Sequence, residues 1–326
     1  MRELNQFEDY LVHEFVEDYE DGLMSRRDLV GRVLHISGGV ASAAAVLTSL
    51  GVRPLAASAQ QGSPAAGSPP AATPSGPRSP LSVAADDPRI VGEDITFPGK
   101  DGATLMAYQA RPSAQATPTA AGTWPVVLVC HENRGLTDHI RDVARRWAVE
   151  GYVACAVDLL SRHGGTQAIA DPAQIPALLT NTDPMQHVAD FQSAATFYGS
   201  QSFADAARLG MNGFCFGGGI TWLCTTQMPE LKGSAPYYGP PPPLDQVPNI
   251  KAAVFAVYSS DPNDFANKGR DELKQALEAA HVTFAFKVYP GTQHAFNNDT
   301  GPRWNRDQSI AAWRDVQDWF TQYVKG

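Results

Sequence analysis

A cysteine set between glycines is the residue whose surroundings best suit covalent chemistry. Segment 213–219 reads Gly-Phe-Cys-Phe-Gly-Gly-Gly; the apolar run before it predicts a strand, and the residues after it predict a helix. A nucleophile on such a turn needs small residues two positions away, because larger ones would collide with neighbouring backbone. The turn also points the sulfur at a helix N-terminus, which favours a thiolate and a developing oxyanion. We therefore identify Cys215 as a candidate nucleophile; the alternative is a buried cysteine on a glycine-rich turn.

An activated thiol needs a base and a group that orients the base, and two later segments supply candidates. Asp261 follows the apolar run 252–258, and His294 follows the apolar run 283–289. Both are expected at the carboxyl edge of a parallel sheet, where catalytic groups of open α/β sheets gather. We predict His294 as the base and Asp261 as the carboxylate that orients it. Asp264 is near enough in the chain to compete for that role.

The loop after the apolar run 125–130 is expected to complete the site. It reads His-Glu-Asn-Arg-Gly over 131–135, at a position where an α/β-hydrolase carries oxyanion-hole residues. The backbone N–H groups of Phe216 and Asn133 are the predicted oxyanion donors. Glu132 could hold or accept the thiol proton; the alternative is an ordinary solvated loop glutamate.

The elements that must position these residues follow an alternating pattern. Strands are expected at 90–97, 104–110, 125–130, 152–157, 209–214, 234–238, 252–258 and 283–289, and helices at 139–150, 185–198, 217–226, 270–280 and 306–323. Two opening strands followed by repeated strand–helix units indicate a mostly parallel sheet covered on both faces. The expected fold class is therefore α/β, with the α/β-hydrolase arrangement.

The chain divides into three regions by composition. Residues 1–59 contain an acidic start, the pair Arg26 and Arg27, and a modest apolar run over 36–52, an order that indicates a twin-arginine-like export signal with cleavage after Ala59. The alternative is an N-terminal helix that packs on the protein or anchors it. Residues 60–88 are rich in Pro, Ala, Ser and Gly and predict a flexible linker. Residues 89–326 form the predicted enzymatic domain.

Charge and cysteine usage exclude several other classes. A net charge of −9 argues against a nucleic-acid or anionic-membrane surface. The four cysteines lack the close pairing of zinc or redox motifs, so no metal is expected, and Cys130 and Cys155 are taken as buried free thiols. We expect a small-molecule partner, a monomer, a periplasmic or extracellular location, and no stable membrane span after cleavage.

These features together resemble the dienelactone hydrolases, or carboxymethylenebutenolidases, from about Ile90 to the C-terminus. The resemblance is carried by segments 213–218, 131–135, 151–154, 158–162 and 294–296. It implies a carboxylic ester hydrolase that opens a small ester or lactone through an acyl-enzyme, without a metal or organic cofactor.

The resemblance also implies a role for each matching residue. Cys215 would be the acylated nucleophile, His294 and Asp261 would complete the triad, and Glu132 would help to generate the thiolate. Arg162 would bind a substrate carboxylate.

The sequence departs from the family pattern at a second carboxylate-binding arginine, where it has Asn298. An amide does not replace bidentate recognition by arginine, although Arg303 could reach the site. An esterase, thioesterase or acyltransferase acting on another carbonyl is therefore a rival function. A non-catalytic exported binding module is a rival from a different class.

Overall fold

The structure, a computed structural model, describes residues 4–52, 78–113 and 122–326. Its sheet has eight strands: β1 (Ile90–Pro98), β2 (Thr104–Pro112), β3 (Trp124–Cys130), β4 (Val153–Asp158), β5 (Ala204–Phe214), β6 (Leu231–Tyr237), β7 (Ala253–Ser259) and β8 (Phe284–Tyr289). Their order is β1-β2-β4-β3-β5-β6-β7-β8; β2 is antiparallel to β1 and β4, and the other pairs are parallel. The expected α/β-hydrolase arrangement is confirmed.

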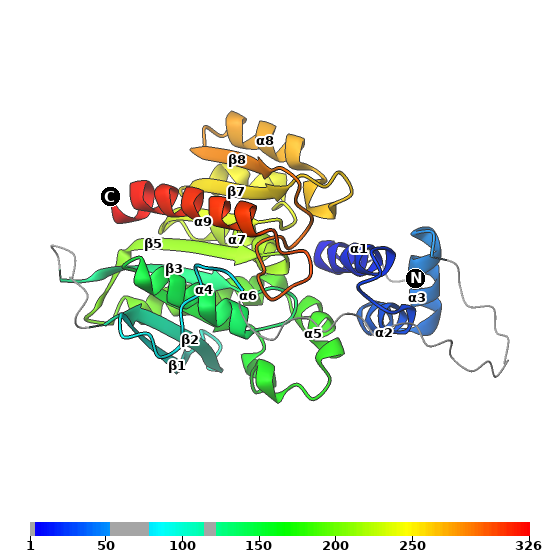
Figure 1. The fold of residues 1–326 in the computed structure, drawn as a ribbon, viewed down its shortest axis with the longest axis horizontal. Helices are drawn as coiled ribbons and strands as arrows, with labels where there is room; N and C mark the ends of the chain where they lie inside the picture. Colours follow the sequence, from blue (N-terminus) through cyan, green and yellow to red (C-terminus); the bar gives the residue numbers. More distant parts are fainter. Residues whose placement is uncertain (1–3, 53–77, 114–121) are drawn as a thin grey trace.

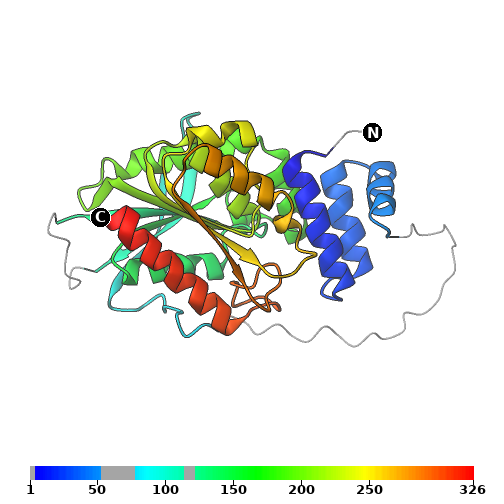
Figure 2. The same ribbon diagram turned by 90° about the horizontal axis from the view of Figure 1, so that it is seen from above.

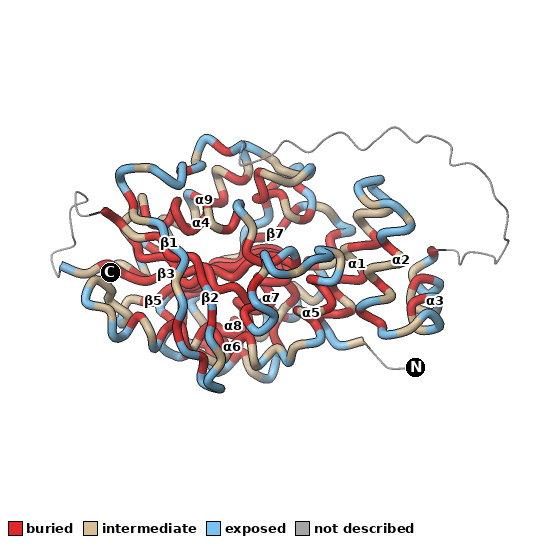
Figure 3. Tube along the Cα trace, turned by 90° about the horizontal axis from the view of Figure 1, so that it is seen from below, coloured by how far each residue is buried: buried red, intermediate tan, exposed pale blue. Residues whose placement is uncertain are grey.

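Helices cover both faces of this sheet. They are α4 (Asp138–Val149), α6 (Pro184–Tyr198), α7 (Phe216–Gln227), α8 (Arg270–Ala279) and α9 (Arg306–Phe320). The short helix α5 (Ile175–Asn181) packs on the N-terminal helices instead. Figure 3 shows α4 and α9 on one side of the sheet and α6, α7 and α8 on the other. Every residue of β3 and β4 is buried, as expected for parallel strands covered on both faces. The strands and long helices of this body match the predicted ranges closely, whereas the short helix α5 was not predicted.

Three N-terminal helices lie beside the α/β body: α1 (Gln6–Glu20), α2 (Arg26–Ser37) and α3 (Val40–Ser49). Figure 2 shows α1 nearest the body and α3 farthest from it. The Asn5 side chain caps α1 and Glu8 returns the hydrogen bond in a capping box, while Ser25 caps α2. The described part of the region is folded into helices, and α1 packs on α5 and α7 of the body.

No single helix among the described residues is long and apolar enough to cross a membrane. Helices α2 and α3 together have the length and composition of a span, but they are bent by 115°. A signal sequence near an N-terminus has the same length and composition.

The predicted linker, residues 60–88, is described only from Arg78 onward, and that part packs on the body. The carboxylate of Asp299 accepts hydrogen bonds from the backbone N–H groups of Arg78 and Ser79, at 3.1 and 2.8 Å. The N–H of Val83 donates to Asp142 at 2.7 Å, and the Val83 side chain is buried. Residues 78–83, which the sequence places in the predicted linker, thus contact the α/β body. The predicted cleavage position at Ala59 lies outside the described residues.

Candidate active site

Cys215 sits on the sharp turn between β5 and α7. Its backbone has φ 58° and ψ −122°, a conformation rarely adopted by residues other than glycine. A Cβ added to Gly213 would lie 2.4 Å from the carbonyl oxygen of Gly217, and one added to Gly217 would lie 2.3 Å from that of His131. The glycines on both sides are therefore required by close backbone approach, as the sequence predicts for a nucleophile elbow.

His294 lies on the loop after β8 and pairs with a carboxylate from the loop after β7. Its Nδ1 is 3.1 Å from Oδ1 of Asp264, and both side chains are almost completely buried. Asp264 also accepts hydrogen bonds from the Ser259 hydroxyl and, at 3.0 Å, from the N–H of Ala266. Burial opposes the charged form of both groups, but their ion pair dominates: it raises the pKa of His294 well above its usual range and lowers that of Asp264.

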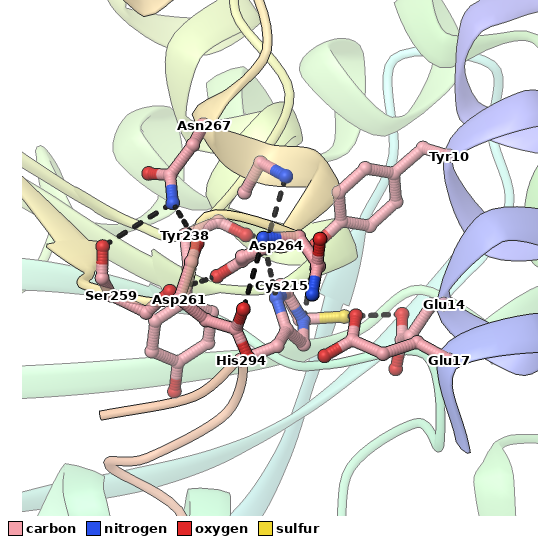
Figure 4. Close-up of polar contacts among 12 residues, drawn as sticks. Tyr10, Glu14, Glu17, Cys215, Tyr238, Ser259, Asp261, Asp264, Asn267 and His294 are labelled. Atoms are coloured by element: carbon pink, nitrogen blue, oxygen red, sulfur yellow. Dashed lines mark hydrogen bonds and ion pairs between the residues drawn. The ribbon is translucent and has the colours of Figure 1, made fainter. Parts of the chain in front are cut away.

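The carboxylate that orients His294 is therefore Asp264, and the choice of Asp261 requires correction. Asp261 is only partly buried, and its Oδ1 accepts a hydrogen bond from the N–H of Asn263 at 2.9 Å, within its own turn. The carboxylate that faces His294 belongs to Asp264, three residues later in the chain. Figure 4 shows Asp264, with Asp261 beside it, around His294.

The thiol of Cys215 contacts a glutamate from α1 instead of Glu132. Its Sγ donates to Oε2 of Glu14 at 3.1 Å, and Oε1 of Glu14 accepts from Nδ2 of Asn133 at 2.9 Å. Glu132 accepts a hydrogen bond from Nδ2 of Asn298 at 2.5 Å and borders the same pocket as Cys215. Glu132 thus lines the same pocket as Cys215, but Glu14, from outside the expected domain, lies next to the sulfur.

A second residue of α1 reaches the histidine. The hydroxyl of Tyr10 donates to the carbonyl oxygen of Tyr238 at 2.8 Å and lies 3.2 Å from Nε2 of His294 (Figure 4). Sequence reasoning missed both Tyr10 and Glu14, because the first 24 residues were interpreted as a polar start. The available signals were the Asn5–Glu8 capping box and apolar residues spaced three or four apart along α1.

The predicted oxyanion donors lie beside the nucleophile. Phe216 is the first residue of α7, so its N–H has no acceptor within the helix. Asn133 lines the pocket that also contains Cys215. His131 holds this loop in place: its Nδ1 donates to the carbonyl oxygen of Glu132 at 2.7 Å, and its Nε2 accepts from the N–H of Leu159 at 3.2 Å. Burial lowers the pKa of His131, which suits this neutral, structural role.

The pocket over Cys215 has a volume of about 320 Å³. Its lining comes from α1 and the turn after it, from the loop after β3, and from the loop between β8 and α9: Glu14, Asp18, Gly22, Leu23, Glu132, Asn133, Arg134, Cys215, Ala295, Asn298, Gly301, Pro302 and Arg303. A small ester or lactone fits such a space, and its lining includes two arginines, Arg134 and Arg303, of which Arg303 pairs with Asp18.

Arg162 is not among the residues that line this pocket. Its guanidinium instead pairs with the buried Asp190 at 2.7 Å and with Asp101 at 2.9 Å. These ion pairs raise its pKa still further. The expected carboxylate-binding role of Arg162 is therefore not supported by its position, because both acidic partners already occupy its donors.

One group of side chains near the elbow has the composition of a metal site. Glu14, Cys215 and His294 each offer one ligand atom, and these atoms lie within 4.8 Å of one another. Carboxylate, thiolate and imidazole are all zinc ligands. In this structure, however, hydrogen bonds from Cys215 to Glu14 and from His294 to Asp264 and Tyr10 already account for their arrangement. Cys130, Cys155 and Cys224 are buried and unpaired.

Comparisons with known proteins agree with this fold. The "Dienelactone hydrolase family" matches residues 112–324, so α1, α2 and α3 lie outside the match. Proteins of Methylorubrum extorquens and Salmonella typhi, each described as "Putative carboxymethylenebutenolidase", are 33% and 34% identical to the chain. The alignments cover 74% and 76% of this chain and 84% and 93% of those proteins.

Solved structures give the same result. The crystal structure of a "Putative Dienelactone Hydrolase" from Klebsiella pneumoniae is 33% identical, with a TM-score of 0.65, and the match covers 72% of this chain and 99% of that one. An acylaminoacyl peptidase from Pyrococcus horikoshii is 14% identical with a TM-score of 0.55, over 73% of this chain and 42% of that one, and shares the fold alone.

Proposed function

Because this chain belongs to the dienelactone hydrolase family and is a hydrolase, we propose that it opens small esters or lactones with Cys215 as nucleophile and His294 as base. The observation that carries the proposal is the strained elbow of Cys215, close to a buried His294–Asp264 pair and open to a pocket. A structural cysteine has no need of that backbone strain, of two flanking glycines in close backbone contact, or of an oriented histidine.

The proposed reaction begins when His294 takes the thiol proton and the sulfur bonds to the carbonyl carbon. The carbonyl oxygen becomes an oxyanion and accepts hydrogen bonds from the N–H groups of Phe216 and Asn133. The carbon–oxygen bond of the ester then breaks, and the leaving oxygen receives the proton from His294. Water, deprotonated by His294, cleaves the thioester, releases the acid and restores the thiol. Asp264 stabilises the imidazolium at both stages.

The class of substrate follows from the thiol and from the pocket. A thiolate is also a good leaving group, so esters whose alcohol product is stabilised, such as enol lactones, suit it better than alkyl esters. With Arg162 paired elsewhere, a substrate carboxylate would meet Arg134 in this pocket, because Arg303 is paired with Asp18 and Asp21 while α1 is in place. The loss of the expected arginine favours a broader ester range than dienelactone alone.

The direct test is to assay the full chain and Cys215→Ala against a dienelactone and p-nitrophenyl acetate. We expect hydrolysis by the parent and loss of at least about 10³-fold in the variant, since removing the nucleophile of a related triad costs more than that. An alanine variant as active as its parent would show that Cys215 is not the nucleophile. The ratio of the two substrates ranks lactone opening against general esterase activity.

We also propose that the chain is exported by its twin-arginine-like segment. The supporting observations are the Arg26–Arg27 pair at the start of α2 and the span-like composition of α2 with α3. Cell fractionation of the full chain and of Arg26→Lys/Arg27→Lys tests this: the parent should reach the exported fraction and the variant should stay inside. Equal distributions would contradict export. A single mass in light scattering would test the expected monomer.

A further inference from the structure

Helix α1 contacts the proposed nucleophile, the proposed base and the loop of the predicted oxyanion donor Asn133. Glu14 holds the thiol of Cys215, and Tyr10 touches Nε2 of His294 (Figure 4). The second carboxylate oxygen of Glu14 accepts a hydrogen bond from the side chain of Asn133. Phe7 packs against the ring of Phe216, with ring centroids 5.3 Å apart. These contacts come from a segment that lies outside the residues matched by the family.

The contact with Tyr10 removes the base. A tyrosine hydroxyl has one proton, and that of Tyr10 is donated to the carbonyl oxygen of Tyr238. With that proton committed, the hydroxyl oxygen can accept from a protonated Nε2 of His294, which lies 3.2 Å away. The ion pair with Asp264 raises the pKa of His294 well above its usual range, so this geometry favours the imidazolium. An imidazolium has no lone pair with which to take the proton of Cys215.

The contact with Glu14 keeps the thiol protonated. Burial, followed by the negative charge of Glu14, raises the pKa of Cys215 to about 12, although His294 acts in the opposite direction. Only 2% of the cysteine is exposed while α1 is in place. Burial also raises the pKa of Glu14. At neutral pH the sulfur is therefore a thiol held against the carboxyl group of Glu14, and the reactive thiolate is scarce.

A cluster of charges holds the end of α1 against the pocket. Arg303, in the pocket wall, pairs with Asp18 at 2.7 Å, with Asp21 at 2.7 Å and with Glu17 at 3.9 Å. The arginine side chain is only 7% exposed. The carboxylates of α1 thus satisfy an arginine that would otherwise face an incoming acidic substrate.

We propose that α1 is an intramolecular inhibitor: it occupies the active site in the resting chain and must withdraw before Cys215 can react. The proposal rests on the proposed function of Cys215 and His294. A ligand that carries a carboxylate can compete with Asp18 and Asp21 for Arg303. Cleavage after Ala59 would remove α1 together with the export segment and open the site permanently.

The test weakens the hold of α1 without touching the catalytic groups. Asp18→Asn/Asp21→Asn removes two partners of Arg303 in the full chain, and Glu20→Gln/Asp86→Asn removes two exposed charges that do not contact Arg303. The readout is alkylation of Cys215 by iodoacetamide at neutral pH, located by peptide mass, with Cys215→Ala reporting any labelling of the other thiols. Circular dichroism checks that each variant folds.

We expect the first variant to be alkylated about tenfold faster than the parent, since losing two partly exposed ion pairs weakens closure by about that factor. The control should match the parent. Tyr10→Phe, which deletes only the hydroxyl, and Glu14→Gln, which deletes only the charge, should also speed alkylation and ester hydrolysis. Equal rates in parent and release variants would overturn the proposal, and slower hydrolysis in Glu14→Gln would instead make Glu14 part of the working site.

These outcomes are separate from the failure of the proposed function. Alkylation requires no ester, so a released chain that alkylates rapidly and hydrolyses nothing would support inhibition by α1 and refute the hydrolytic role. A full chain that hydrolyses esters as fast as every release variant would support hydrolysis and refute inhibition.

Discussion

Replacing Asp264 by Asn should cost most of the activity, whereas the same change at Asp261 should not. The Asp264 carboxylate lies 3.1 Å from Nδ1 of His294, and both groups are buried. Two unit charges at that distance interact by about 5 kcal/mol at an effective dielectric constant of about 20. Since about 1.4 kcal/mol is a factor of ten in rate, losing this stabilisation of the imidazolium should lower kcat nearly 10⁴-fold. Asparagine has nearly the same shape, so the fold should survive.

The assay is hydrolysis of p-nitrophenyl acetate by the parent, Asp264→Asn and Asp261→Asn in the same full chain, followed over pH. Asp261→Asn should stay within about threefold of the parent, because Asp261 only accepts a hydrogen bond within its own turn. Asp264→Asn should also lower the pKa of His294, since the ion pair with Asp264 is what raises it against burial. An equal loss in the two variants, or a small loss in Asp264→Asn, would refute this assignment of the triad acid.

Three further predictions concern the elements around the site. Gly213→Ala should destabilise the fold by about 3 kcal/mol, because its Cβ would meet the carbonyl oxygen of Gly217. Gly31→Ala, with no atom within 4 Å of the added Cβ, should stabilise the fold by about 0.5–1 kcal/mol. Urea unfolding measures both changes, and equal free energies of unfolding in the two variants would contradict the prediction. Arg162→Ala should lower the free energy of unfolding by about 2 kcal/mol, because the buried Asp190 would lose its cation. The kcat/KM of the variant should stay within about twofold of the parent. A large rise in KM for an acidic ester would instead identify Arg162 as a substrate ligand. Burial would raise the pKa of Asp299, but His139 and Arg146 lower it. The carboxylate therefore stabilises the fold fully above its unfolded pKa of about 4, and this stabilisation is lost as the pH falls through the folded pKa. Asp299→Asn should make the free energy of unfolding depend less on pH below about pH 4, and an unchanged acid transition would contradict this.

The α/β body could be predicted because its strands are strongly patterned. Interior parallel strands such as β3 are apolar throughout, and the turns between elements are marked by Gly and Pro. The sharp turn at Cys215 could also be predicted from the sequence, since the glycines around it are required by local backbone contacts. Cys215 and His294 were therefore identified from spacing alone, and the structure places them together with Asp264.

What could not be predicted depends on tertiary contacts. Asp261 and Asp264 lie three residues apart on one loop, and only the path of the turn after β7 decides which faces His294. Arg162 satisfied the family pattern in sequence, but the fold pairs it with Asp190. The position of α1 could not be predicted, because the pattern of an acidic helix does not indicate the surface on which it packs. Its acidic residues meet Arg303 and Cys215 only in the folded chain.

The most direct test of the central claim is to trap the acyl-enzyme. The full chain and Asp18→Asn/Asp21→Asn are mixed with p-nitrophenyl acetate, quenched in acid and analysed by peptide mass, beside Cys215→Ala. We predict one acetyl group on the peptide that contains Cys215, more of it in the release variant, and none in the alanine variant. Hydrolysis at the parent rate by Cys215→Ala, or acetyl found only at another residue, would contradict the cysteine mechanism.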